Sequence, residues 1–92
     1  MADVVLEKDL TILNEKGLHA RAAATFVKSV ENIDAEIFVS RVGQTVGGSS
    51  IMGLMMLAAS KGTVIHIKAK GKEAQKAIDV LTLLINSKFG EE

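Results

Sequence analysis

The chain contains seven segments in which the pattern of apolar and polar residues predicts a regular element. Four segments alternate apolar and polar residues, which is typical of half-buried strands: residues 4–13, 35–41, 44–46 and 63–69. Three segments are predicted to be helical, from apolar residues at intervals of three and four or from a serine cap before an apolar run: residues 20–31, 51–58 and 73–87. Glycines lie between most of these segments and mark turns.

The order of these elements predicts the fold class. Strand, helix, strand, strand, helix, strand and helix follow one another, and each strand is apolar on one face only. This order predicts an α+β open-faced sandwich, in which a four-stranded antiparallel sheet carries three helices on one face. The chain has 92 residues and shows no linker or low-complexity segment. We therefore expect a single domain over residues 1–92.

The composition narrows the classes of function. Eleven basic and eleven acidic residues give a formal net charge of zero, which argues against general binding to nucleic acid or to anionic membranes. Tyr and Trp are absent and Phe occurs three times, so aromatic platforms for stacking bases are not expected. The chain has no cysteine and two well-separated histidines, so neither a disulfide framework nor a metal site is expected.

The sequence also indicates where the protein works. Nothing at Met1–Asp3 or just beyond resembles a signal peptide. The longest apolar-rich run, Ile51–Ala59, has about half the length that a membrane span needs. We therefore expect a cytoplasmic protein that does not insert into membranes.

The stretch Gly17-Leu18-His19-Ala20-Arg21 places a histidine and an arginine at the predicted start of a helix. Helix N-termini bind anions, because their first amides are unpaired and the helix dipole is positive there. A neutral imidazole here can act as a nucleophile, and the amides of Ala20, Arg21 and Ala22 can hold an anion together with the Arg21 guanidinium. Alternatively, His19 only begins the helix, and the alanines reflect high helix propensity. Our hypothesis is that His19 carries a phosphoryl group.

Two motifs together resemble the HPr family, the histidine-containing phosphocarriers of the bacterial phosphotransferase system. The first motif is Gly17-Leu18-His19-Ala20-Arg21, and the second is Ser49-Ser50-Ile51-Met52-Gly53-Leu54. Either motif alone is weak, but the resemblance covers essentially the whole chain, including the order of elements and the spacing between the motifs. It implies a phosphocarrier that needs no cofactor and is a protein substrate of other enzymes more than an enzyme itself.

The resemblance also implies roles for individual residues. The family's phosphorylated histidine falls on His19 and its phosphate-binding arginine on Arg21. Enzyme I, itself phosphorylated by phosphoenolpyruvate, would pass the group to Nδ1 of His19, and a IIA domain would receive it. The family's regulatory serine falls on Ser50, which an HPr kinase/phosphorylase phosphorylates in many relatives. An ordinary helix N-cap is the other interpretation of Ser50.

A docking surface for these partners is implied beside the histidine. It would consist of apolar residues of the second helix and a basic rim: Ile51, Met52, Met55, Arg21 and Lys28. Leu54 and Leu57 are expected to face inward. The alternative is that the methionines of this helix fill the core, as methionines usually do. We expect the protein to be a monomer.

Two positions depart from the family's pattern. Ala22 stands where the family usually has proline, which fixes φ and carries no amide hydrogen. The first helical turn is therefore expected to be more mobile here. Ser49 stands where a lysine commonly precedes the regulatory serine. It is itself a rival acceptor for a phosphoryl group.

Three functions are compatible with these features. The first is the sugar-transporting phosphotransferase system, with His19 as the phosphoryl carrier. The second keeps the fold and His19 but serves a regulatory, nitrogen-type phosphotransferase chain without sugar transport. The third is a non-catalytic α/β module that binds an anion or a protein. The His-x-Arg spacing argues against a passive site, so we predict a phosphocarrier.

Overall fold

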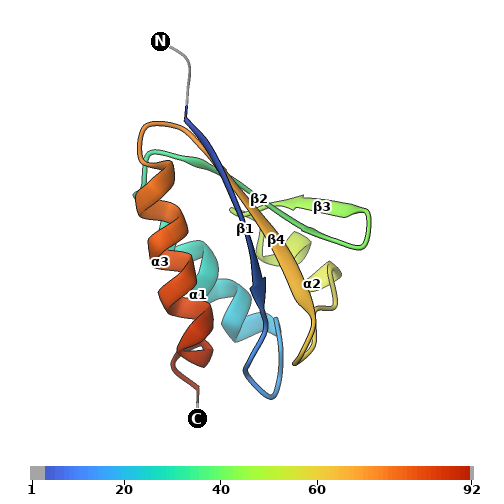
Figure 1. Ribbon diagram of the computed structural model, residues 1–92. Helices are drawn as coiled ribbons and strands as arrows, with labels where there is room; N and C mark the ends of the chain where they lie inside the picture. The colour runs from blue at the N-terminus through green and yellow to red at the C-terminus, as the bar shows by residue number, and fades with distance from the viewer. Residues whose placement is uncertain (1–3, 92) are drawn as a thin grey trace.

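The structure, a computed structural model that describes residues 4–91, has the predicted order of strands and helices (Figure 1). The strands in this part of the chain are β1 (Val5–Thr11), β2 (Glu36–Arg41), β3 (Gln44–Gly47) and β4 (Val64–Lys70). The helices are α1 (Ala20–Val30), α2 (Ile51–Met56), α3 (Ala74–Asn86) and a short 3-10 helix, η1 (Lys88–Gly90). Met1–Asp3, the residues used to argue against a signal peptide, lie outside the described part.

The four strands form one antiparallel sheet in the order β1-β4-β2-β3. β4 therefore lies between the first and second strands of the chain. Val42 and Gly43 join β2 to β3, and both have positive φ, 45° and 77°. This is the backbone that a tight two-residue hairpin turn requires. The strands predicted over residues 35–41 and 44–46 therefore form a hairpin.

The helices cover one face of the sheet, which confirms the predicted open-faced sandwich (Figure 1). α3 packs on β1 and β4, while α1 packs against both α2 and α3. Alternate strand residues bury their side chains under the helices, as a period of two requires: Leu10, Ile37, Val39, Ile65, Ile67 and Ala69. The helices contribute the residues of their apolar stripes: Ala23, Phe26, Val30, Leu54, Ala77, Leu81 and Ile85. None of the helices in the described residues is long and apolar enough to cross a membrane.

Several elements end within two residues of their predicted bounds. α2 ends at Met56 and not at Ala58, because the amides of Leu57 and Ala58 bond to carbonyls three residues back and Ala58 has a φ of 51°. These bonds close a tighter turn that cannot continue an α-helix. Gly47, one residue beyond the predicted strand 44–46, is the last residue of β3 and pairs with Phe38.

The helix η1 follows α3 and was not predicted. Lys88 and Phe89 have φ values of 60° and 57°, so the chain leaves the path of α3. The side chain of Phe89 is buried in the core. Burial of this ring compensates for a left-handed backbone that a bulky residue rarely adopts. Glu91, which follows η1, contacts His19 just before α1.

Candidate functional site

His19 is the N-cap residue of α1, with extended backbone angles of −77° and 179°. The Ala23 amide donates the first bond of the helix to the His19 carbonyl at 2.8 Å. The amides of Ala20, Arg21 and Ala22 therefore precede the helical hydrogen-bond ladder, and the first turn contains no acidic residue. The His19 side chain makes no capping bond to these amides. The start of α1 thus presents amide donors, and the imidazole of His19 does not occupy them.

The loop before His19 is fixed by contact with the segment after α2. The Leu18 amide donates to the Ala59 carbonyl at 2.9 Å. Gly17 has a φ of 67°, and a Cβ atom there would lie 2.4 Å from the same carbonyl oxygen. Only glycine combines this backbone with this approach. The packing places His19 at a defined position although it follows a turn.

Side chains of both charges surround His19 in a surface pocket of about 300 Å³, lined by Glu15, Lys16, His19, Arg21 and Glu91. Glu15 accepts a hydrogen bond from Lys61 Nζ at 2.6 Å. This bond, with the charge of Lys61, lowers the pKa of Glu15. His19 and Arg21, the two site residues predicted from the sequence, both line this pocket, next to a second cation, Lys16.

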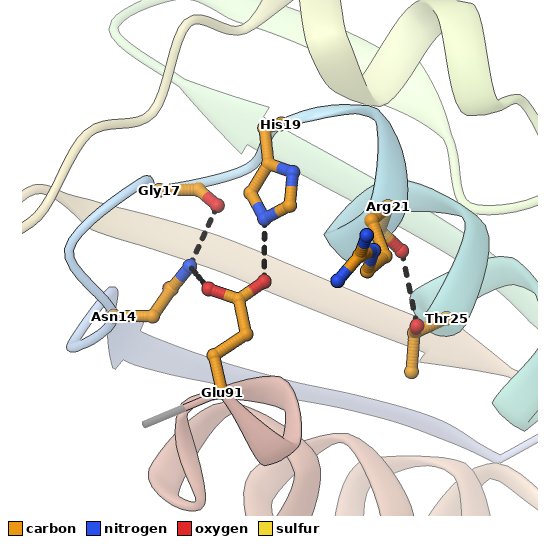
Figure 2. A network of polar contacts seen from close by, with 6 residues as sticks. All are labelled: Asn14, Gly17, His19, Arg21, Thr25 and Glu91. Carbon is orange, nitrogen blue, oxygen red and sulfur yellow. Dashed lines mark hydrogen bonds and ion pairs between the residues drawn. The ribbon is translucent and has the colours of Figure 1, made fainter.

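Glu91 is the direct partner of His19 and was not predicted from the sequence (Figure 2). Its Oε2 atom contacts His19 Nε2, and its Oε1 atom accepts from Asn14 Nδ2 at 3.0 Å. The hydrogen bond to His19, followed by the one to Asn14, lowers the pKa of the Glu91 carboxyl. The two side chains are 27% and 22% exposed. His19 Nδ1 points away from this contact (Figure 2).

Asn14 links this contact to the loop. Its Nδ2 also donates to the Gly17 carbonyl at 2.8 Å, and the side chain is buried. Two acceptors therefore face the amide nitrogen, which fixes the orientation of the amide group. Among the described residues Asn14 Oδ1 has no hydrogen-bond partner. Asn14 resembles an ordinary turn residue in the sequence, and Glu91 follows the last periodic helix by several residues, so no local pattern marks either one.

α2 carries the second group of predicted residues. Ser50 is its N-cap, and the Gly53 amide donates to Ser50 Oγ at 2.9 Å. The predicted apolar surface is exposed, with Ile51, Met52 and Met55 at 41%, 72% and 43%. Met56 is exposed as well, while Leu54 and Leu57 are buried as predicted. We call Ile51, Met52, Met55 and Met56 the α2 patch.

The α2 patch belongs to an element that packs directly on the helix of His19, since α1 and α2 are in contact. Arg21 and Lys28 are exposed on α1. Met52, Met55 and Met56 are exposed and are not core residues. The alternative interpretation, that the methionines of this helix fill the core, is therefore wrong.

The second histidine, His66, lies on the open face of the sheet. Its Nδ1 is 2.7 Å from Asp9 Oδ1, and its Nε2 is 2.6 Å from Glu7 Oε1. Hydrogen bonds to Asp9 and then to Glu7 raise the pKa of His66. Within residues 4–91 no group of three His, Cys, Asp or Glu side chains is arranged to hold a metal ion.

Comparison with known proteins relates this geometry to phosphocarriers. A family model described as the PTS HPr component phosphorylation site matches residues 6–87. The phosphocarrier protein HPr of Neisseria meningitidis is 45% identical over 87 residues, which are 95% of this chain and 98% of the relative. A crystal structure of HPr from Thermoanaerobacter tengcongensis superposes with a TM-score of 0.90 at 42% identity, covering 95% of this chain and 98% of the other. A phosphocarrier protein NPr of Shewanella violacea is 37% identical over 94% of both chains.

Proposed function

The chain belongs to the PTS HPr family and is a phosphocarrier of the phosphotransferase system, and on that premise we propose that His19 carries its phosphoryl group. A phosphocarrier is a phosphoryl-transfer intermediate and not a catalyst, so its site must accept the group and also release it. The observation that supports the proposal is the position of His19 at the N-cap of α1, with Nδ1 directed away from Glu91.

The surroundings of His19 suit a phosphoryl group on Nδ1. The amides of Ala20, Arg21 and Ala22 precede the helical ladder, where the helix dipole favours an anion. Arg21 lines the same pocket and adds a charge-assisted hydrogen bond to a phosphoryl oxygen. Phosphoryl transfer asks a protein mostly for positioning and charge stabilisation. Exposed donors of this kind stabilise the phosphorylated state without enclosing it.

We propose the α2 patch as the docking surface for both partners, Enzyme I and IIA proteins. Its core is Ile51, Met52 and Met55, and Arg21 and Lys28 form its basic rim. An exposed apolar surface of flexible methionines adapts to more than one partner. The contact between α1 and α2 supports the proposal, because a partner seated on α2 also reaches the start of α1. We place this exchange in the cytoplasm and propose that residues 1–92 act as one monomeric domain.

The sugar-transporting system is the preferred setting. The HPr relatives reach 45% identity, whereas the NPr relative reaches 37% over a similar share of the chain. This difference favours sugar transport over a regulatory, nitrogen-type chain.

The direct test is to incubate the protein with Enzyme I and labelled phosphoenolpyruvate. Wild type should gain acid-labile label, and His19→Ala should gain none, because the accepting nitrogen is missing. His66→Ala is the matched control and should label like wild type, since His66 lies on the open face of the sheet with carboxylates on both nitrogens. Label that persists on His19→Ala would show that another residue is the acceptor.

Ser50 is the proposed regulatory phosphosite. Its hydroxyl caps α2 next to the exposed Met52, and a phosphoryl group there would add about two negative charges at a helix N-terminus beside the docking surface. Those charges would oppose acidic partners. ATP and an HPr kinase should place acid-stable phosphate on wild type and on Ser49→Ala, but not on Ser50→Ala. Equal labelling of Ser50→Ala and loss of label from Ser49→Ala would move the site to Ser49.

A further inference from the structure

We propose that Glu91 is a positioning residue for phosphoryl transfer, holding the proton of neutral His19 on Nε2 and the lone pair on Nδ1. The inference rests on the proposed function of His19 and adds a residue that lies 72 positions away in the sequence. Glu91 acts through the imidazole and makes no contact with the transferred group. Its effect is to set the fraction of His19 that has a lone pair on Nδ1.

The first support is the geometry of the contact. Glu91 Oε2 meets His19 Nε2, and Nδ1 is on the opposite side of the ring (Figure 2). The second carboxylate oxygen accepts from Asn14 Nδ2 at 3.0 Å, and that same amide is tied to the Gly17 carbonyl. The carboxylate is thus held by the loop that carries His19. Glu91 and His19 cannot shift independently without losing one of these bonds.

The second support is proton chemistry. A lowered pKa keeps the Glu91 carboxyl ionised at neutral pH, and an ionised carboxylate only accepts hydrogen bonds. The imidazole nitrogen that faces it must therefore donate, which places the ring proton on Nε2. In a neutral imidazole the other nitrogen then carries the lone pair. The contact selects Nδ1 as the nucleophile.

The same contact has a role during transfer. The Nδ1 lone pair attacks phosphorus on the phosphorylated donor protein; the Nδ1–P bond forms while the bond from phosphorus to the donor breaks and its electron pair returns to the donor. Nε2 keeps its proton throughout. The phosphorylated ring then bears a positive charge, which the Glu91 carboxylate balances from the side opposite the phosphoryl group.

The third support is that the fold fixes the position of Glu91. Phe89 is buried in the core with a left-handed backbone, and the Glu91 amide donates to the Lys88 carbonyl at 2.9 Å. The segment that carries Glu91 is therefore anchored two residues before it. A carboxylate on an anchored turn loses less conformational freedom on binding His19 than one on a free tail.

The first test reads the proton directly. In the ¹⁵N-labelled full-length protein at a pH where the imidazole is neutral, His19 should show one tautomer, with an Nε2 proton protected from exchange. Glu91→Ala should lose this protected resonance and show both tautomers. Glu91→Gln should favour the Nδ1–H tautomer, because Asn14 Nδ2 binds the amide oxygen and the amide NH2 group then donates to His19 Nε2. Glu15→Gln is the matched control: it removes a carboxylate of the same pocket that is bound to Lys61, and it should leave the His19 tautomer unchanged.

The second test measures transfer from phosphorylated Enzyme I. Glu91→Ala should slow labelling about tenfold, the cost of losing a hydrogen bond to a charged group, and Glu91→Gln should be slowed at least as much, because its amide NH2 group favours a proton on Nδ1. An unchanged tautomer and rate in Glu91→Ala would overturn the proposal, as would Glu15→Gln reproducing its effects. The tautomer is read without any donor, so it decides on Glu91 even if His19 proves not to be the acceptor.

Discussion

The two histidines of this chain both contact carboxylates, yet their surroundings differ in one decisive respect. His66 has a carboxylate on each ring nitrogen, from Asp9 and Glu7 on the neighbouring strand. His19 has a carboxylate on one nitrogen only, and the other faces the pocket at the start of α1. Carboxylates on both sides favour a doubly protonated ring, which has no lone pair to attack with. One carboxylate leaves one nucleophilic nitrogen.

The supporting structures of the two histidines differ as well. His66 lies on β4 directly opposite Asp9 in the strand register, so the pairing of β1 and β4 alone brings the two together. His19 is placed by a loop, and the loop is held by a close backbone approach at Gly17 and by the anchored turn that carries Glu91. The orientation of His19 therefore depends on long-range packing, whereas that of His66 follows from the sheet.

The largest effect is expected at Gly17. Gly17→Ala imposes a left-handed backbone on alanine and brings its Cβ to 2.4 Å from the Ala59 carbonyl oxygen, so it should lower the free energy of unfolding by about 3 kcal/mol. The loop should move to relieve the overlap. The imidazole resonances of His19 should shift, and those of His66 should stay in place. Chemical denaturation and the NMR spectrum of the imidazoles measure both effects.

Gly43→Ala is the control for Gly17→Ala. Gly43 has a φ of 77°, but a Cβ atom added there would meet nothing within 4 Å, so alanine bears only the backbone penalty, about 1–2 kcal/mol. Both histidines should keep their resonances in this variant. Equal losses in the two variants would show that the contact with Ala59 contributes nothing to holding the loop.

A smaller effect is expected at His66, and it should depend on pH. The pKa of His66 is raised in the folded protein above its ordinary value of 6.5, so the stabilisation is fully present below pH 6.5 and is lost as the pH rises through the folded pKa. His66→Gln should therefore destabilise the protein more below pH 6.5 than well above it. All three side chains are at least 40% exposed, which limits the effect to about 0.2–1 kcal/mol.

Denaturation curves of wild type and His66→Gln across this pH range measure that difference. Lys68→Gln is a suitable control, because Lys68 lies on the same strand face and carries no imidazole. Its cost should be constant with pH. A constant cost for His66→Gln as well would show that the two carboxylates do not favour the charged ring.

Local patterns predicted the fold and only half of the site. Alternation, helical spacing and a serine cap located the four strands and three helices, whereas the surface at Ile51, Met52 and Met55 was implied by the resemblance to the HPr family. His19 and Arg21 were predicted because a helix start has its own chemistry. Asn14 and Glu91 were missed, because the contacts of Glu91 with Asn14 and His19 join segments more than 70 residues apart in the sequence. The turn at Lys88 and Phe89 was missed for a related reason, since only burial of the ring compensates for its backbone.

The anchored turn after α3 has a practical consequence for anyone who attaches a tag to this protein. β1 starts at the opposite end of the molecule from η1 (Figure 1). A fusion partner joined after Glu92 would follow closely in sequence on the carboxylate that contacts His19, so we expect its bulk and charge to disturb the pocket. We expect one joined before β1 to leave the pocket unchanged. Affinity handles and fluorophores for transfer assays therefore belong on the N-terminal side.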